Sequence, residues 1–233
     1  NLLNQKVAIY LCNRFNCTID LTPTSIEAWQ INGELKIYDW ANEEDISAYL
    51  MKSSSIGSLF SYLSCIIFKK SEWNSLTPDT YFFDTAYIHA DMLFAMLIGH
   101  SKIMYIPDAL VYNRTGNDSF DSYSHAHRIL LDLRGYVALG NKHFGGNIAL
   151  HNQFIYVLYK ECCNFYFSKW TRVLRIKSCS SSSDWNELVS LVTLNFGDYP
   201  KARVIAFIDK IPVSRVLMRS IMWIKRQVTQ NAR

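Results

Sequence analysis

The segment from residue 81 to residue 120 (YFFDTAYIHADMLFAMLIGHSKIMYIPDALVYNRTGNDSF) constrains the fold more than any other part of the chain. Apolar residues at helical spacing predict a helix over Asp84–Ile98, and Gly99 is a suitable residue to end it. A short buried strand, Lys102–Ile106, is then expected to stop at Pro107. Polar clusters flank these elements, so the segment predicts an α/β fold with reactive side chains at the ends of rigid elements.

Composition limits the classes of protein to which the chain can belong. Its 233 residues are 49% apolar and 14% aromatic, which predicts a sizeable core in one large domain or in one domain with an appendage. The net charge of +4 is modest, and the basic residues are scattered until the last 20 positions, so a dedicated nucleic-acid binder is not expected. No uncharged apolar run reaches about 18 residues, the length that a membrane-spanning helix needs. The six cysteines lack C-x-x-C spacing, which favours reduced thiols over a zinc site.

The rest of the first half predicts strands and one short helix. Val7–Cys12 and Leu59–Phe68 are apolar runs typical of buried strands. Glu34–Trp40 alternates and is expected at a sheet edge, and Asp45–Lys52 is expected to be helical.

The chain beyond Phe120 is predicted to be helical, and we place a boundary near residue 121. The expected helices are Ser124–Leu139, Asn152–Trp170, Trp185–Asn195 and Pro212–Val228, with Ser178–Asp184 as a linker. The last helix interleaves Arg215, Arg219, Lys225 and Arg226 with large apolar residues. Such a helix can lie on an anionic membrane surface or pack as an ordinary helix with solvated charges, and the pattern fits both equally.

The start of the Asp84–Ile98 helix carries the first candidate site. Asp84, Tyr87, His89 and Asp91 crowd its N-terminal turns. Histidine can act as a base near neutral pH, and free N–H groups at a helix start attract anions. The alternative is a histidine that makes a structural hydrogen bond.

The run R-T-G-N-D-S after the strand is the second candidate. The planar fork of Arg114 suits a phosphate, whereas Asn117, Asp118 and Ser119 could simply bond the backbone of their own loop. A third candidate, the small-residue loop around Ser55 and Gly57, matches no standard phosphate-binding pattern and reads more simply as a plain loop.

Several of these stretches together resemble a known family. They are I-Y-L-C-N-R (9–14), S-I-G-S-L-F-S-Y-L-S (55–64), T-A-Y-I-H (85–89), Y-I-P-D-A-L-V (105–111) and R-T-G-N-D-S-F (114–120). On these motifs residues 1–120 look like the C-terminal, acceptor-side half of a family-2 glycosyltransferase domain of the GT-A fold. They are most similar to the abequosyltransferases of bacterial O-antigen (lipopolysaccharide) synthesis. Residues 121–233 match only in general helical character and would form a C-terminal region that associates with membrane.

The resemblance implies transfer of a sugar, the 3,6-dideoxyhexose abequose from CDP-abequose, to an undecaprenyl-diphosphate-linked oligosaccharide. The enzyme would be a peripheral protein at the inner face of the cytoplasmic membrane. His89 would be the base or would orient the acceptor, with Tyr87 in support and with Asp84 and Asp91 as rival bases. The implied substrate-binding residues are Arg114, Asn117, Asp118 and Ser119 near the donor diphosphate, and Ser55 and Gly57 near the sugar.

One motif of the family is missing. Its donor half ends in a D-x-D motif that holds a divalent metal, Mg²⁺ or Mn²⁺, and no Asp-x-Asp occurs in this chain. We therefore expect an N-terminally truncated chain that binds no metal and does not turn over alone. The alternatives are a family-2 transferase for another nucleotide sugar and a non-catalytic, membrane-associated scaffold.

Overall fold

The structure, a computed structural model, describes residues 7–83, 85–99, 101–114 and 125–211. The chain forms two compact units, one of residues 1–119 and 134–161 and the other of residues 120–133 and 162–233. The division at residue 121 into two domains stays a prediction, because compactness alone does not define a domain.

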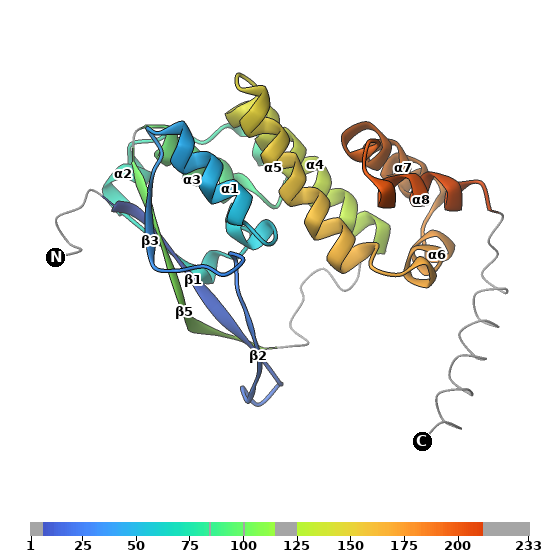
Figure 1. Ribbon diagram of the computed structural model, residues 1–233, viewed down its shortest axis with the longest axis horizontal. Helices are drawn as coiled ribbons and strands as arrows, with labels where there is room; N and C mark the ends of the chain where they lie inside the picture. Colours follow the sequence, from blue (N-terminus) through green and yellow to red (C-terminus); the bar gives the residue numbers. More distant parts are fainter. Residues whose placement is uncertain (1–6, 84, 100, 115–124, 212–233) are drawn as a thin grey trace. The chain divides into compact units, whose positions relative to one another are not determined.

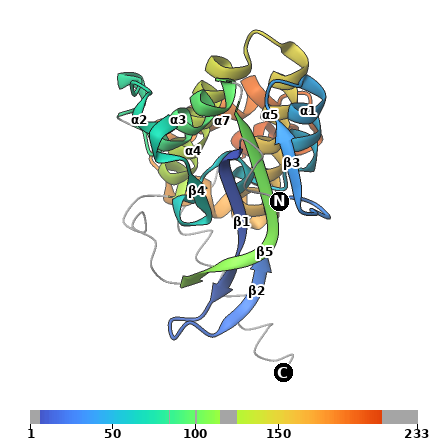
Figure 2. The ribbon, with the colours of Figure 1, turned by 90° about the vertical axis from the view of Figure 1, so that its left-hand side faces the viewer.

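The first unit is built on a mixed sheet whose strands follow the order β2-β1-β5-β3 (Figure 2). The strands are β1 (Val7–Cys17), β2 (Pro23–Glu27), β3 (Lys36–Asp39), β4 (Ile66–Phe68) and β5 (Lys102–Arg114). The long strands β1 and β5 run parallel, whereas β2 and β4 pair antiparallel with β1 and β3 pairs antiparallel with β5. Because β1 and β5 run parallel, the polar C-terminal part of β1 lies beside β5, near the candidate site described below.

Helices cover one side of this sheet, where Figures 1 and 2 place α1, α3 and α5. The bounds are α1 (Glu43–Lys52), α2 (Lys70–Asn74), α3 (Ile88–Ile98), α4 (His125–Phe144) and α5 (Ile148–Glu161), and α4 belongs to the first unit from residue 134 onward. Short 3-10 turns lie at Ile56–Leu59, Leu63–Cys65 and Thr80–Phe82.

Aromatic rings fill the core between these helices. Phe94 of α3 is fully buried, and its ring centroid lies 5.0 Å from that of Phe60, 5.6 Å from Phe144 and 5.8 Å from Phe154. Such edge-to-face contacts add about 0.5–1.5 kcal/mol per pair beyond the burial of area. The core therefore fixes α3 against the segment that contains Phe60.

The second unit is helical. Its elements are a π-helical turn at Cys162–Tyr166, α6 (Trp170–Cys179), α7 (Ser182–Phe196) and α8 (Pro200–Asp209). Lys177 closes the end of α8, because its Nζ donates to the carbonyl oxygens of Ile208 (3.1 Å) and Ile211 (2.9 Å).

The mixed α/β class is confirmed, but several predicted elements were wrong. Leu59–Phe68 is not one strand: it contains a 3-10 turn before the three residues of β4. Phe60 has a φ of 70°, in the left-handed region, which ends the preceding 3-10 turn and prevents continuous pairing. The helix predicted from Asp84 begins at Ile88 instead.

The strand predicted to stop at Pro107 continues to Arg114. Ile106 pairs with Cys12 and Ala109 pairs with Asn13, so two residues of β5 around Pro107 have no partner in β1. A bulge of this kind tolerates proline, because the missing N–H is not needed for the ladder.

The predictions for β3 and α1 are confirmed in place, and those for the later helices are corrected in their bounds. β3 lies at the sheet edge, and α1 begins at Glu43 because Asn42 caps it. The single helix expected over Asn152–Trp170 is instead the end of α5, which stops at Glu161, followed by the π-helical turn, and Trp170 is the first residue of α6. The linker is shorter than the expected Ser178–Asp184, because α6 continues to Cys179 and Ser181 already caps α7. The predicted helix Pro212–Val228 lies outside the described residues.

Candidate functional site

The segment from Ser55 to Tyr62 is the centre of the candidate site. Ser55 caps its 3-10 turn by accepting a hydrogen bond from the backbone N–H of Gly57 (3.3 Å). Glu161 of α5 accepts the N–H of Ile56 (3.3 Å) and so holds the same turn from the helix side. Ser55 is buried, with 6% of its surface exposed, so its hydroxyl first serves the local fold.

Gly57 is present because the indole of Trp29 packs directly on it. A Cβ at position 57 would lie 2.1 Å from the Trp29 ring, a distance that no real contact shows. The structure thus gives Gly57 a packing role, and its predicted contact with sugar stays a prediction.

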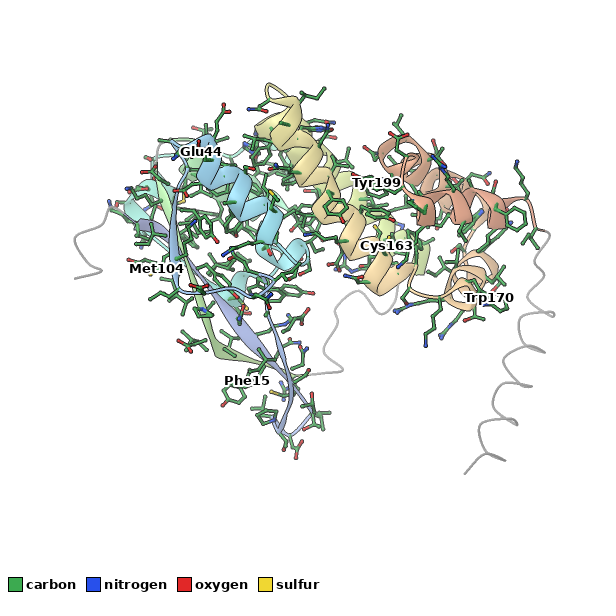
Figure 3. The ribbon with its side chains drawn as sticks, viewed as in Figure 1. Phe15, Glu44, Met104, Cys163, Trp170 and Tyr199 are labelled. Atoms are coloured by element: carbon green, nitrogen blue, oxygen red, sulfur yellow. The ribbon has the colours of Figure 1, made fainter. Side chains whose placement is uncertain are left out.

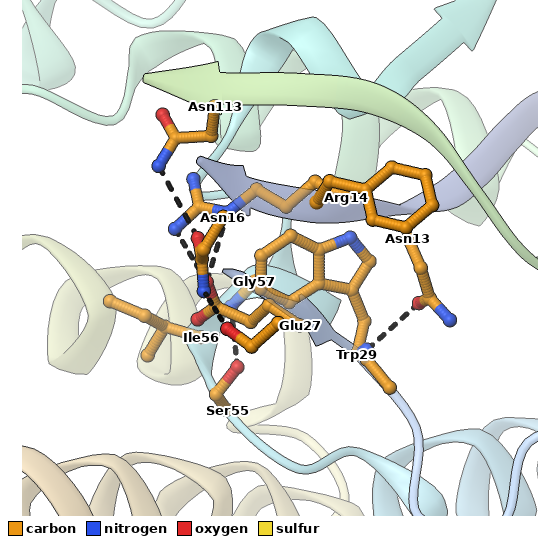
Figure 4. A network of polar contacts seen from close by, with 12 residues as sticks. Asn13, Arg14, Asn16, Glu27, Trp29, Ser55, Ile56, Gly57 and Asn113 are labelled. Carbon is orange, nitrogen blue, oxygen red and sulfur yellow. Dashed lines mark hydrogen bonds and ion pairs between the residues drawn. The ribbon is translucent and has the colours of Figure 1, made fainter. Parts of the chain in front are cut away.

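A cluster of charged and aromatic side chains adjoins this glycine (Figure 4). The Arg14 Nε and Nη2 atoms both donate to one carboxylate oxygen of Glu27, at 2.9 and 2.7 Å. The Arg14 guanidinium lies 3.7 Å from the ring centroid of Tyr62, and that ring stacks on Trp29 with centroids 5.1 Å apart. A guanidinium held by a carboxylate and an aromatic face is pre-organised, and the Arg14 side chain is largely buried within the cluster.

Asn13 holds Trp29 in position through hydrogen bonds. The Asn13 Oδ1 accepts hydrogen bonds from the backbone N–H of Trp29 (3.0 Å) and from the Tyr105 hydroxyl (2.9 Å), and the Asn13 Nδ2 donates to the Pro107 carbonyl (2.7 Å). Asn13 is 3% exposed, so these bonds replace the water that it loses on folding.

The cluster of Asn13, Arg14, Glu27, Trp29 and Tyr62 was missed as a candidate site in the sequence. An available signal was the pair Asn13-Arg14 directly after the apolar run Val7–Cys12, because polar residues buried in a strand need partners. Those partners come from three separate stretches of the chain, so spacing alone does not connect them.

His89 lies on α3, and its Nε2 atom is 2.8 Å from the carbonyl oxygen of Phe60. A carbonyl oxygen only accepts, so Nε2 carries the proton and the lone pair of the neutral ring is on Nδ1. Burial lowers the pKa of His89 below its usual value, although the bond to Phe60 opposes this effect. The ring is therefore neutral at pH 7 and can accept a proton at Nδ1.

Tyr87 is part of the core. Its ring lies 4.4 Å from that of Tyr136 on α4, and a Cβ on Gly135 would come within 2.4 Å of it. Tyr136 in turn donates its hydroxyl to the carbonyl of Leu59 (3.1 Å). Tyr87 is 2% exposed and packs its end of α3 against α4, and its predicted support of His89 in catalysis stays a prediction.

Asp91 is engaged in a buried ion-pair network rather than presented to a substrate. Its Oδ1 lies 2.8 Å from both Lys142 Nζ and His143 Nε2, and the residue is 2% exposed. Burial opposes the charge of Lys142, but its bonds to Asp79 and Asp91 raise the pKa of its ammonium group. The network joins the start of α3 to the end of α4.

We predict that Asp91→Asn costs stability but leaves catalysis almost unchanged. The neutral amide weakens charge-assisted bonds at a buried position, which costs about 1–3 kcal/mol of unfolding free energy. Chemical denaturation measures this loss, and sugar transfer is expected to stay within about threefold of wild type, a loss below 1 kcal/mol. A loss of transfer as large as that of a His89 variant would reinstate Asp91 as the base.

Arg114 is the last residue of β5, opposite Cys17 of β1, and its side chain is exposed. The neighbouring Asn113 donates to Asn16 (3.4 Å), which ties this end of the two strands together (Figure 4). Asp84, Asn117, Asp118 and Ser119 lie outside the described residues, so their predicted roles stay predictions.

Two structural features bear on metals and membranes. Across the described ranges, no group of three or more His, Cys, Asp or Glu side chains is placed to hold a metal ion. Those residues therefore do not fit a divalent metal site, and we derive no catalytic step through a metal. In the same ranges, every helix is too short or too polar to cross a bilayer.

Comparison with known proteins shows to which kind of protein the chain is related. No protein-family model matches the chain, and no solved structure matches it. Abequosyltransferase RfbV from Salmonella typhimurium is 32% identical to it over 185 residues, which are 78% of this chain and 54% of that protein. The chain is a relative of this abequosyltransferase. The resemblance inferred from the motifs is thus confirmed, and the chain spans about half the length of the relative.

The extent of the match bears on the candidate site. A continuous match over 78% of 233 residues must include residues 55–180, wherever its two ends fall. That range contains Ser55–Tyr62 and His89, whereas Asn13, Arg14, Glu27 and Trp29 lie before it. The relationship therefore extends over part of the candidate site.

Proposed function

We propose that the chain is part of a glycosyltransferase, and that the sugar it transfers is abequose supplied as CDP-abequose. The observation that carries the proposal is the 32% identity to an abequosyltransferase over 185 residues. The hydrogen bond between His89 and Phe60 supports it, because it leaves a neutral imidazole with a free basic nitrogen.

The proposed reaction uses His89 as the general base. The acceptor hydroxyl oxygen forms a bond to the anomeric carbon of the sugar, and its proton passes to Nδ1 of His89. The bond from the anomeric carbon to the diphosphate breaks, and the nucleoside diphosphate leaves with the electron pair. The Phe60 carbonyl holds the Nε2 proton throughout, so it fixes the tautomer of the ring and stabilises the imidazolium that forms.

The substrates suggest roles for the exposed end of β5. Arg114 has an exposed guanidinium, and a planar fork of donors suits the diphosphate of the donor. We propose that the acceptor is an undecaprenyl-diphosphate-linked oligosaccharide and that the protein acts at the inner face of the cytoplasmic membrane. We also propose that the complete gene product, unlike the described residues, binds a divalent metal, Mg²⁺ or Mn²⁺.

We predict that the complete gene product transfers abequose from CDP-abequose to a lipid-linked oligosaccharide. Mass spectrometry of the glycolipid measures the added dideoxyhexose. UDP-glucose and GDP-mannose serve as competing donors, and we expect at least about a tenfold preference for CDP-abequose, or about 1.4 kcal/mol of discrimination.

Each other outcome has a distinct meaning. Preference for another donor would reject abequose while keeping a transferase. Absence of transfer from all donors by a folded, membrane-supplemented protein would reject the enzyme and favour the scaffold.

A further inference from the structure

One face of α6 is basic and contains no acid. The helix sequence WTRVLRIKSC includes Arg172 and Arg175 and no Asp or Glu, and Lys169 directly precedes it. All three of these cations are exposed. Among the residues that the structure describes, no ion pair joins any of them to a carboxylate. Their charge is therefore not neutralised by a carboxylate within the described part of the chain.

The opposite side of α6 is fixed in the unit. Val173 and Ile176 are each 2% exposed, and they alternate with the exposed cations at helical spacing. Lys177 turns away from the cations and donates to carbonyls at the end of α8. The basic residues consequently form an outward face whose orientation is set by the packing of the helix.

Trp170 adds a large exposed apolar group at the start of α6, directly after Lys169 (Figure 3). It is the first residue of α6 and is 60% exposed. An indole has an apolar body and a polar N–H, and tryptophan is enriched where protein meets the headgroups of a bilayer. Exposed Trp beside Arg and Lys is the composition of an interfacial helix.

Among the described helices of this unit, α6 differs in having no acidic residue, whereas α8 carries Lys201 and Arg203 together with Asp209. The next helix, α7, carries Asp184 and Glu187 and no Lys or Arg. The first turn of α6 also has no acidic residue, and no side chain caps it. Free N–H groups at such a helix start are complementary to phosphate, which strengthens the match to an anionic surface.

We propose that the exposed residues Lys169, Trp170, Arg172 and Arg175, here called the α6 surface, bind the anionic surface of a lipid bilayer. The cations would contact headgroup phosphates, and the indole would lie at headgroup level. The inference goes beyond sugar transfer and does not depend on it, because membrane binding needs neither donor nor acceptor. It also concerns residues distinct from the predicted helix Pro212–Val228.

Vesicle co-sedimentation of the full chain tests the proposal. We expect binding to vesicles of phosphatidylglycerol and phosphatidylcholine, and little binding to phosphatidylcholine alone. Arg172→Gln with Arg175→Gln should weaken binding about 30-fold, since each cation near an anionic surface contributes about 1 kcal/mol. Trp170→Ser should weaken it about tenfold through loss of the buried indole.

Matched variants control for charge and for apolarity. Lys69→Gln with Lys70→Gln removes two charges elsewhere, and Leu194→Ser removes an apolar side chain that is 80% exposed on α7. Both should bind like wild type, and circular dichroism should show that every variant folds.

Three results would overturn the proposal. They are wild-type binding by the double Arg variant, equal losses in the controls, and failure of the wild-type chain to bind anionic vesicles. Tighter binding to double-stranded DNA than to the vesicles would identify a nucleic-acid surface instead.

Discussion

His89→Ala is expected to reduce sugar transfer by about 10²–10⁴-fold, the usual contribution of a general base. The structure supports the base role because the Phe60 carbonyl fixes the proton on Nε2 and leaves Nδ1 as the acceptor. Single-turnover transfer by the complete gene product, with acceptor in excess, measures this loss at the chemical step. The thermal midpoint should stay close to that of wild type, since His89 is only half-buried.

Two further variants separate catalysis from structure. Glutamine at position 89 can still donate to Phe60 but cannot accept a proton near neutral pH, so His89→Gln should lose as much activity as His89→Ala. His151→Ala removes another histidine, one that bonds Asn141 (2.9 Å), and should retain transfer. Substantial transfer by His89→Gln would mean that His89 only holds the Phe60 turn.

The second large effect is structural. Trp29→Ala should reduce the free energy of unfolding by about 3–5 kcal/mol, because a fully buried indole is replaced by a cavity. The Trp29 Nε1 bond to the Cys12 carbonyl (2.7 Å) is lost as well. Urea denaturation measures the change. Trp170→Ala is the matched control, since an exposed tryptophan should change stability by no more than about 0.5 kcal/mol.

A double-mutant cycle tests whether Gly57 exists for Trp29. Gly57→Ala alone forces the indole to move and should cost about 1–3 kcal/mol. The same substitution in the Trp29→Ala background should cost much less, because the clashing ring is gone. If Gly57→Ala reduced the free energy of unfolding equally in both backgrounds, a contact other than that with Trp29 would be the reason for glycine at this position.

The sequence was most informative where one residue type carries chemistry by itself. His89 was identified correctly as a residue near a helix start, and β3 was placed at a sheet edge. The partner of His89 could not be predicted, because the apolar run that contains Phe60 has the pattern of a buried strand. Only the left-handed backbone at Phe60 reveals the turn, and no glycine marks that position.

Long-range partners are the other features that the sequence does not reveal. Asp91 has the spacing of a candidate base, and its partners Lys142 and His143 lie about 50 residues further along the chain. Arg14, Glu27 and Tyr62 are likewise brought together only by the pairing of β1 with β2 and by the turn after Gly57. Periodicity identifies elements, but it contains no information about which ends of those elements meet.

The dependence of kcat/KM on pH tests the role of His89 most directly. Burial lowers the pKa of this imidazole, so the basic, neutral form persists below the usual histidine value of 6.5. We predict that transfer stays level from pH 8 down to that value, then falls as His89 becomes protonated. This acid limb should be absent from the residual activity of His89→Gln. A limb that begins well above pH 6.5, or one that persists in His89→Gln, would contradict the assignment of His89 as the base.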